Sequence, residues 1–252
     1  MLLFEMDRFG IEAAVLICAC IGNNSTNRDY AFGMAEAHPD RFVVFPDLEC
    51  NWFGIPRRTG AAARLEAALA RWSFPGFTVY LDENESGVWL GEADAEAFFR
   101  LAAERRLIVS LSAFPHHLRH VAMLAERQPD LTILLHHFSF FGPRSGTGPA
   151  NHAPLRRLAL LPNVYVKYSG MGNIAGEEEE YPYPGLRWIS QAVGECFGPA
   201  RTIWGSDWPV SQRHITYRQS LELLRRHGPY TASEQEAVLG GNFRRMLAAA
   251  GV

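Results

Sequence analysis

Short apolar runs bounded by turn residues alternate along this chain with longer segments whose apolar positions recur at helical spacing. Runs of the first kind predict strands, and segments of the second kind predict amphipathic helices. The expected strands are Ala13–Cys18, Phe42–Asp47, Phe77–Leu81, Leu107–Ser112, Leu131–His137, Val164–Tyr168 and Thr202–Trp204. The expected helices are Leu2–Phe9, Tyr30–Ala37, Ala61–Trp72, Ala93–Arg105, Leu118–Gln128, Pro154–Leu160, Leu186–Phe197, Gln219–Arg226 and Glu234–Ala250.

The strand segments are continuously apolar rather than alternating, which is typical of a parallel sheet covered by helices. This pattern predicts an α/β fold. A nucleotide-binding doubly wound sheet carries a glycine-rich turn after its first strand, whereas the turn Ile21–Ser25 contains a single glycine. The closed (β/α)8 TIM barrel, typically about 250 residues long, fits this chain of 252 residues better.

We therefore expect a single barrel domain over residues 1–252. The seven predicted strands are one short of the eight that close such a barrel. Because the chain begins with a predicted helix, Leu2–Phe9, the missing element should be the first strand.

Composition narrows the class of partner. The chain has 24 Lys and Arg against 27 Asp and Glu, a formal charge of −3, and 48% hydrophobic residues. This near-neutral balance argues against a nucleic-acid or anionic-membrane binder and favours a small-molecule substrate.

The longest apolar run, Ala13–Ile21, is far shorter than the roughly 20 residues that cross a bilayer. With Glu5 and Asp7 in its first apolar stretch, the chain does not begin like a signal peptide, and we expect a cytoplasmic protein.

The carboxyl ends of barrel strands carry the catalytic groups, so the ionisable residues there are the candidates. Asp207 follows the last strand in Gly-Ser-Asp, where a carboxylate can accept a proton from water or bind a metal. It could equally begin a helix, because Trp-Pro comes next. His136 and His137 end an earlier strand, and only one of two adjacent strand residues should face the barrel axis. Neutral imidazole serves either as a metal ligand or as a general base.

Three further residues are candidates for substrate binding. Lys167 lies within an apolar strand, where a buried ammonium needs a carboxylate partner or a substrate anion. Ser169 follows the same strand, and Tyr80 lies at the end of another. The segment Gly170–Gly185, with its acidic run, predicts one long loop on the same face, either solvated or acting as a lid.

Several segments resemble the amidohydrolase-related TIM-barrel family. They are Leu161–Gly170 (LPNVYVKYSG), Phe197–Val210 (FGPARTIWGSDWPV), Gly241–Arg245 (GNFRR), Gln128–His137 (QPDLTILLHH) with Phe141–Pro143 (FGP), and the opening Glu5–Ile11 (EMDRFGI). The most similar branch holds lactonases, and a neighbouring branch holds decarboxylases. The resemblance implies that Asp207 is the catalytic acid/base and that His137 polarises a carbonyl. It also implies that both would be ligands of a divalent ion, zinc, where one is bound.

The chain departs from the family pattern at three places. Family members normally begin with a strand ending in His-x-His, which is absent here. Thr78 stands where they often have a basic residue, and Ser112 ends a strand where metal-dependent members have histidine. The second and third departures remove a cation and a ligand and weaken the case for zinc, because a catalytic zinc takes about three protein ligands.

The sequence thus leads to one main hypothesis and two alternatives. The main hypothesis is hydrolysis of a lactone or similar cyclic ester of a small carboxylated or hydroxylated compound. Asp207 would act on water, His137 would donate to the oxyanion, and Lys167 would hold a substrate anion. One alternative is a zinc-dependent non-oxidative decarboxylase of a small carboxylic acid. The other is an inactive barrel or incomplete gene product, whose two unpaired sheet edges would favour a homo-oligomer.

Overall fold

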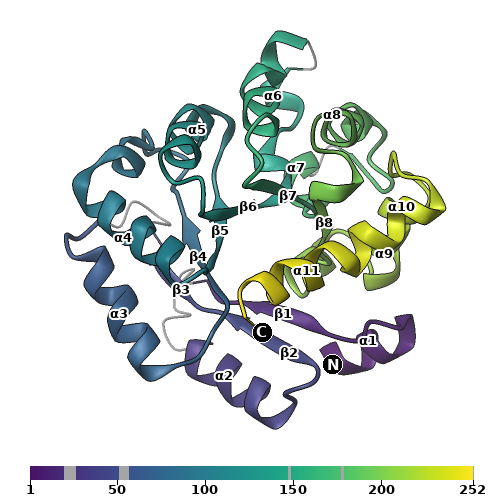
Figure 1. Ribbon diagram of the computed structural model, residues 1–252. Coiled ribbons are helices and arrows are strands. Elements are labelled where there is room, and N and C mark those ends of the chain that lie inside the picture. The colour runs from purple at the N-terminus through teal and green to yellow at the C-terminus, as the bar shows by residue number, and fades with distance from the viewer. Residues whose placement is uncertain (20–26, 51–56, 147–148, 177–178, 252) are drawn as a thin grey trace.

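The computed structural model describes residues 1–19, 27–50, 57–146, 149–176 and 179–251. Its strands are β1 (Ala14–Ile17), β2 (Phe42–Phe45), β3 (Asp47–Cys50), β4 (Gly76–Tyr80), β5 (Ile108–Ser112), β6 (Thr132–Leu135), β7 (Val164–Tyr168) and β8 (Thr202–Trp204). Its helices are α1 (Leu2–Phe9), α2 (Asn27–Ala37), α3 (Ala61–Arg71), α4 (Ala93–Glu104), α5 (Leu118–Arg127), α6 (Ala153–Ala159), α7 (Met171–Ala175), α8 (Arg187–Phe197), α9 (Tyr217–Arg225), α10 (Ala232–Glu236) and α11 (Asn242–Ala249). The helices lie outside the strands (Figure 1).

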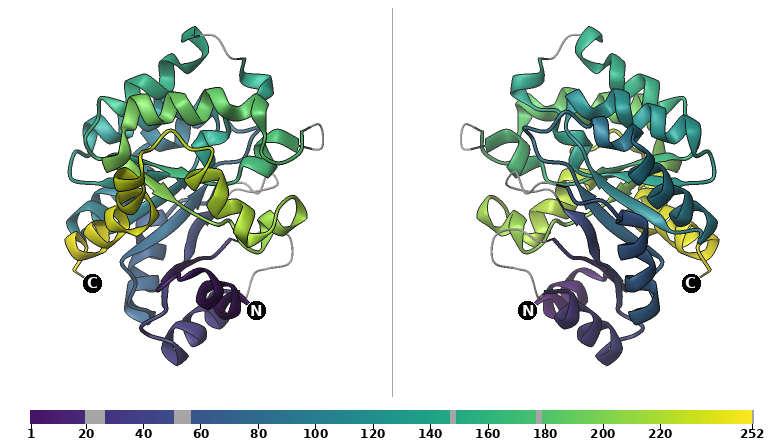
Figure 2. Two further views of the ribbon diagram at one scale, coloured as in Figure 1. Left: turned by 90° about the vertical axis from the view of Figure 1, so that its right-hand side faces the viewer. Right: turned by 90° about the vertical axis from the view of Figure 1, so that its left-hand side faces the viewer.

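The strands form parallel sheets, which confirms the predicted α/β barrel class. β3 to β8 pair in sequence order in a six-stranded sheet, and β1 pairs with β2. Pro46 divides the predicted strand Phe42–Asp47 into β2 and β3, because proline has no N–H to donate to the ladder. Among the described strands β8 and β1 are not paired, so the barrel is open between its first and last strands (Figure 2).

Apolar side chains fill the barrel interior towards the amino ends of the strands. Phe45, Ile108, Leu134 and Ile203 point inward and form one cluster with Met246 of α11. Gly76 is required beside them, since a Cβ there would lie 2.5 Å from both the Phe45 ring and a backbone oxygen.

Helix α11 lies at the opening between β8 and β1. Its Phe243 ring lies 6.1 Å from that of Phe45, and Phe243 and Leu247 pack on the same cluster as Val15 and Ile17 of β1. Helix α11 thus lies in the gap between β1 and β8, which do not pair with each other (Figure 1), and its side chains cover the apolar interior there.

Two helical predictions need correction. The predicted helix Glu234–Ala250 is divided by a π-helical turn, Ala237–Gly241, where two consecutive glycines lower the helix propensity. The predicted loop Gly170–Gly185 contains helix α7, whose Met171 and Ala175 are buried. The burial of these side chains overrides the weak helix propensity of the Gly-Asn pair in α7.

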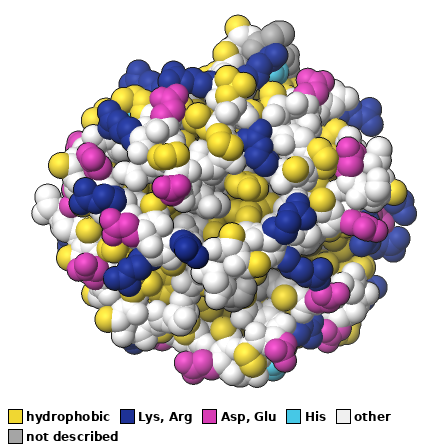
Figure 3. All heavy atoms as spheres, in the orientation of Figure 1, with side chains coloured by type: hydrophobic (Ala, Val, Ile, Leu, Met, Phe, Trp, Pro, Cys, Tyr) yellow, Lys and Arg dark blue, Asp and Glu magenta, His cyan; other side chains and the backbone are white. Residues whose placement is uncertain are grey.

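In the orientation of Figure 1, hydrophobic side chains gather at the centre of one face and charged side chains lie around it (Figure 3). None of the helices in the described ranges is long and apolar enough to cross a membrane.

We predict that Met246→Ala destabilises the protein by about 2–5 kcal/mol, because the variant leaves a cavity in the apolar interior. Met246 is 6% exposed, whereas Met123 on the outside of α5 is 38% exposed. Thermal unfolding should show a fall in Tm of about 5 °C or more for Met246→Ala. The control Met123→Ala should change the Tm little, and equal shifts for the two variants would contradict the role given to α11.

Candidate active site

Polar side chains replace the apolar ones towards the carboxyl ends of the strands. Thr78 of β4 pairs with Ser110 of β5. Two residues further towards the carboxyl ends of the same strands, Tyr80 pairs with Ser112. Both serines and Thr78 are fully buried. His136 follows β6 and continues the inward alternation of Leu134, so its ring lies on the inward side.

Lys167, Ser110 and His136 form a hydrogen-bonded chain across three strands. The Lys167 Nζ donates to the Ser110 Oγ at 2.6 Å, and the Ser110 Oγ lies 2.6 Å from the His136 Nε2. The Tyr80 ring meets the His136 ring edge-on at 5.4 Å. The structure therefore brings together the predicted Lys167, His136 and Tyr80, with Ser110 as their link.

His137 reaches the mouth of the barrel by a different route. It opens the turn His137–Phe140, in which all four residues have positive φ, from 43° to 57°. Each left-handed residue costs about 1–2 kcal/mol, whereas the burial of a Phe side chain such as Phe138 contributes about 1.5–3 kcal/mol. Phe138 packs against Tyr168, and Phe140 stacks on Phe114 at 4.5 Å. These contacts hold the turn that carries the second histidine into the site.

His137 and Asp207 face each other at the mouth. The His137 Nε2 lies 3.6 Å from the Asp207 Oδ1, and each side chain is 15% exposed. The His137 Nδ1 lies 2.9 Å from the Ser169 Oγ, and the Asn173 amide donates to the Asp207 Oδ2 at 2.7 Å. The Asp207 side chain thus meets two groups of the site rather than capping the following helix.

Gly170 makes room for this arrangement. Its φ is +68°, and a Cβ at this position would lie 2.4 Å from the His137 Nδ1. Only glycine lets β7 turn into α7 while the imidazole stays against Ser169.

Burial sets the electrostatics of the site. It lowers the pKa of Lys167 to about 7, against the opposing pull of Asp207. Burial lowers the pKa of His136 well below its ordinary range, and the charges of Lys167 and His137 add to this effect. Burial also lowers the pKa of His137, while Asp207 opposes it. Near neutral pH the two imidazoles are therefore neutral, and Lys167 is poised between its two forms.

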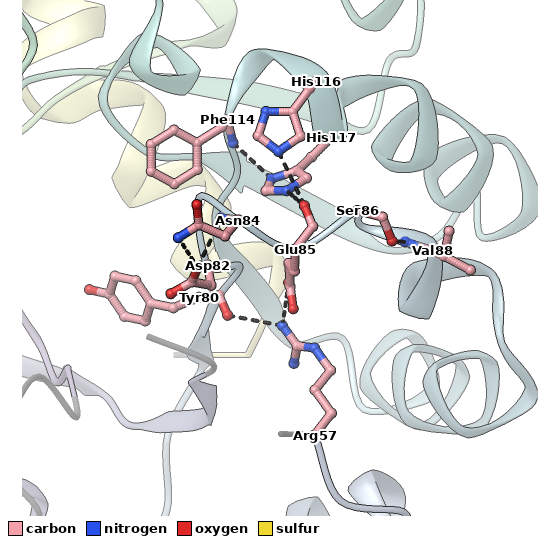
Figure 4. Close-up of polar contacts among 10 residues, drawn as sticks. All are labelled: Arg57, Tyr80, Asp82, Asn84, Glu85, Ser86, Val88, Phe114, His116 and His117. Carbon is pink, nitrogen blue, oxygen red and sulfur yellow. Dashed lines mark hydrogen bonds and ion pairs between the residues drawn. The ribbon is translucent and has the colours of Figure 1, made fainter. Parts of the chain in front are cut away.

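The loop after β4 borders the site and is held by a second polar cluster (Figure 4). The Arg57 Nη2 donates to the Tyr80 carbonyl at 3.0 Å and to the Glu85 Oε1 at 2.9 Å, and its guanidinium lies 4.1 Å from the Trp89 ring centre. His117 is fully buried; its Nδ1 accepts the Phe114 N–H at 3.1 Å, so its Nε2 donates to the Glu85 carbonyl at 2.8 Å.

A pocket opens beside Asp207. Its lining includes Ser169, Asn173, Asp207, Ser211 and His214. The hydroxyl of Ser211 is buried and unpartnered, so it is available to a polar ligand.

The residues that the structure describes do not make a complete zinc site. His137 and Asp207 are close enough to share one ion, but no group of three or more His, Cys, Asp or Glu side chains fit to hold a metal occurs within the described ranges. Ser112 and Thr78, the two departures from the family's histidine and basic residue, present buried hydroxyls without partners among the described residues. Two ligands fall short of the roughly three that catalytic zinc takes.

Two residues of this arrangement were not singled out from the sequence. Ser110 was one of several polar residues at a strand end, and nothing in its own pattern marks it as the link to Lys167. Asn173 lies on α7, in the segment predicted to be a loop. The turn Ile21–Ser25 and residues 177–178 of the acidic run lie outside the described residues.

A parallel α/β barrel with an imidazole and a carboxylate at the carboxyl ends of β6 and β8 has its ionisable groups where barrel enzymes have their active sites. The chain belongs to the amidohydrolase family, whose model matches residues 1–248. It is an enzyme of this family of hydrolases.

Curated relatives and solved structures agree with this assignment. An L-fucono-1,5-lactonase of Burkholderia ambifaria is 31% identical over 208 residues, which cover 81% of this chain and 67% of that protein. An L-fucono-1,5-lactonase of Burkholderia multivorans is 36% identical over 233 residues, covering 85% of this chain and 78% of that protein. A crystal structure of a Burkholderia multivorans amidohydrolase with bound zinc superimposes with a TM-score of 0.80 at 24% identity, over 98% of this chain and 87% of that chain, and shows the same fold.

We predict that His117 makes the protein sensitive to acid. Burial lowers its pKa, so the unfolded chain binds the proton at a pH where the folded protein does not. Its contribution to stability is present above pH 6.5 and is lost as the pH falls below that value.

In His117→Gln, the fall in unfolding free energy between pH 6.5 and 5 should be less steep than in the parent. The difference should be at most about 1.4 kcal/mol per pH unit, the value for one proton. Denaturant unfolding at several pH values measures it. His227→Gln, at a partly exposed ring beside Tyr181, should leave the slope unchanged. The prediction is wrong if both variants follow the parent.

Proposed function

We propose that this protein hydrolyses a lactone of a small hydroxylated acid, with Asp207 as the acid/base. The pairing of Asp207 with His137 at the barrel mouth, 3.6 Å apart, is the observation that carries the proposal. The two L-fucono-1,5-lactonases among the relatives support a sugar lactone as the class of substrate. Hydroxyl and amide groups of Ser169, Asn173 and Ser211 in the adjacent pocket suit a hydroxylated ligand.

The chemistry needs one base and one hydrogen-bond donor. Asp207 takes a proton from water as the water oxygen bonds to the lactone carbonyl carbon. With the Ser169 hydroxyl donating to Nδ1, the His137 Nε2 carries the hydrogen and donates to the carbonyl oxygen as negative charge develops there. The ring C–O bond then breaks, and Asp207 returns its proton to the departing ring oxygen. The product is a hydroxy acid, which ionises and releases one proton.

Asn173 and Lys167 have supporting roles in this proposal. The amide of Asn173 binds one carboxylate oxygen of Asp207 and leaves the other towards His137. Lys167 holds the anionic end of the ligand, with His136, Ser169 and Tyr80 beside it.

We predict that Asp207→Asn loses lactone hydrolysis by about 10²–10⁴-fold, the usual contribution of a positioned acid or base. The assay is the release of protons from a series of sugar 1,4- and 1,5-lactones, including L-fucono-1,5-lactone. The Tm of the variant shows that it remains folded. Asp40→Asn, at an exposed aspartate in the turn before β2, is the matched control and should retain the parental rate. A retained rate in Asp207→Asn, or no lactone opened by the parent, would sink the proposal.

A zinc-dependent decarboxylase is the alternative within the same family. That reaction needs an electrophilic metal, and the described residues supply two ligands for one. We therefore expect lactone hydrolysis to survive dialysis against a chelator. Elemental analysis of the dialysed protein confirms that metal has been removed. Loss of activity that added zinc restores would contradict this expectation, and evolution of CO2 from carboxylic acids would favour the decarboxylase. Failure of the parent in both assays would favour the inactive barrel.

A further inference from the structure

Lys167 has an unusual set of partners for a lysine inside a barrel. Among the described residues it forms no ion pair with a carboxylate, and its hydrogen bond goes to the neutral hydroxyl of Ser110. Lys167 is partly buried, and an ammonium that loses hydration without gaining a counter-ion is costly, so the neutral amine is favoured. The site thus contains a basic group that binds its proton weakly until an anion arrives.

The number of protons on each group sets the direction of the two hydrogen bonds that link Lys167, Ser110 and His136. When Lys167 is an ammonium its Nζ can only donate, so Ser110 accepts from it and its single hydroxyl proton goes to the His136 Nε2. That nitrogen must then carry no hydrogen, in agreement with a neutral His136 that is 2% exposed. The Ser110 hydroxyl is therefore fixed between its two partners and aims a lone pair at Lys167.

The groups that face Lys167 come from four elements. They are His136 and His137 after β6, Asp207 after β8, Ser110 on β5 and, behind His136, Tyr80 on β4. Among the described residues, Asp207 is the carboxylate that acts on Lys167, and it does so from beyond hydrogen-bond distance. A ligand carboxylate at the barrel mouth would add the missing counter-charge.

We propose that Lys167 binds the carboxylate of a hydroxy-acid ligand by taking up a proton, with Ser110 and His136 as positioning residues that tune this uptake. The inference rests on the proposed function, because the carboxylate is that of the ring-opened product. An adjacent carboxylate stabilises the ammonium form, so ligand and proton bind together. Binding weakens, by up to about tenfold per pH unit, as the pH rises above the value at which free Lys167 loses its proton.

Isothermal titration calorimetry with sodium D-gluconate tests the coupling. Paired buffers of low and high ionisation enthalpy, at pH 6 and pH 8, give the number of protons taken up. The parent should take up nearly one proton per gluconate at pH 8 and almost none at pH 6. Sorbitol, which has the same chain length without the carboxylate, should show no uptake. A gluconate affinity that is equal at pH 6 and pH 8, or no gluconate binding at pH 6, would overturn the proposal.

Three variants assign the effect to residues. Lys167→Met should show no proton uptake at pH 8. Ser110→Ala removes the acceptor that supports the ammonium, so gluconate affinity should begin to fall at a lower pH than in the parent. Ser112→Ala is the matched control, because Ser112 lies on the same face of β5, is equally buried and has an unpartnered hydroxyl. It should behave as the parent does. Uptake that persists in Lys167→Met, or equal shifts in the two serine variants, would contradict the assignment.

The titration measures binding without turnover, so it separates the two proposals. Proton-linked binding in a protein that opens no lactone would contradict the proposed function alone. Lactone hydrolysis with gluconate binding that is independent of pH would contradict the inference about Lys167 alone. Thermal unfolding of each variant shows whether a loss of binding comes from a loss of fold.

Discussion

The register of the parallel strands is the constraint on which the site depends. Paired residues on neighbouring parallel strands point to the same side, so the inward side chains of β3 to β8 share one narrow axis. The chain fills the amino end of this axis with apolar side chains such as Phe45, Ile108 and Leu134. Towards the carboxyl end it places Thr78, Ser110 and Lys167. This gradient along the axis confines the ionisable groups to the mouth.

The narrow interior of the barrel also explains why the pKa values of its basic groups are lowered. Basic groups that enter it lose most of their hydration, and burial is the first cause of the lowered pKa of Lys167, His136 and His137. Asp207 faces His137, and a second carboxylate among the described residues, the buried Asp47 of β3, is paired with Arg28. A site with fewer negative than basic groups holds its imidazoles neutral, as hydrogen-bond donors and acceptors, and has room for the negative charge of a ligand or of a transition state.

Much of the fold could be predicted from the sequence, because strands buried on both faces of a parallel sheet require continuous apolar runs. Each of the predicted strands lies within two residues of an observed strand at its start, and Pro46 accounts for the one that is divided. Asp207, Lys167 and His136 could be found as ionisable residues at strand ends. The turn at His137 could not, because His-Phe-Ser-Phe contains no glycine to announce a left-handed backbone. Asn173 was missed for a similar reason, since burial of its neighbours, not helix propensity, forms α7.

The left-handed turn connects the stability of the core to the site. The backbone of residues 137–140 is unfavourable for L-amino acids, and the burial of the Phe138 and Phe141 rings in the core offsets this cost. His137 is thereby set against Ser169, and Gly170 leaves it the space. Asp207 also has positive φ, 54°, and meets the same imidazole from β8. Both partners are thus held by backbone that the surrounding packing must stabilise, so core packing behind β6 and β8, and not only the identity of the two side chains, determines their separation.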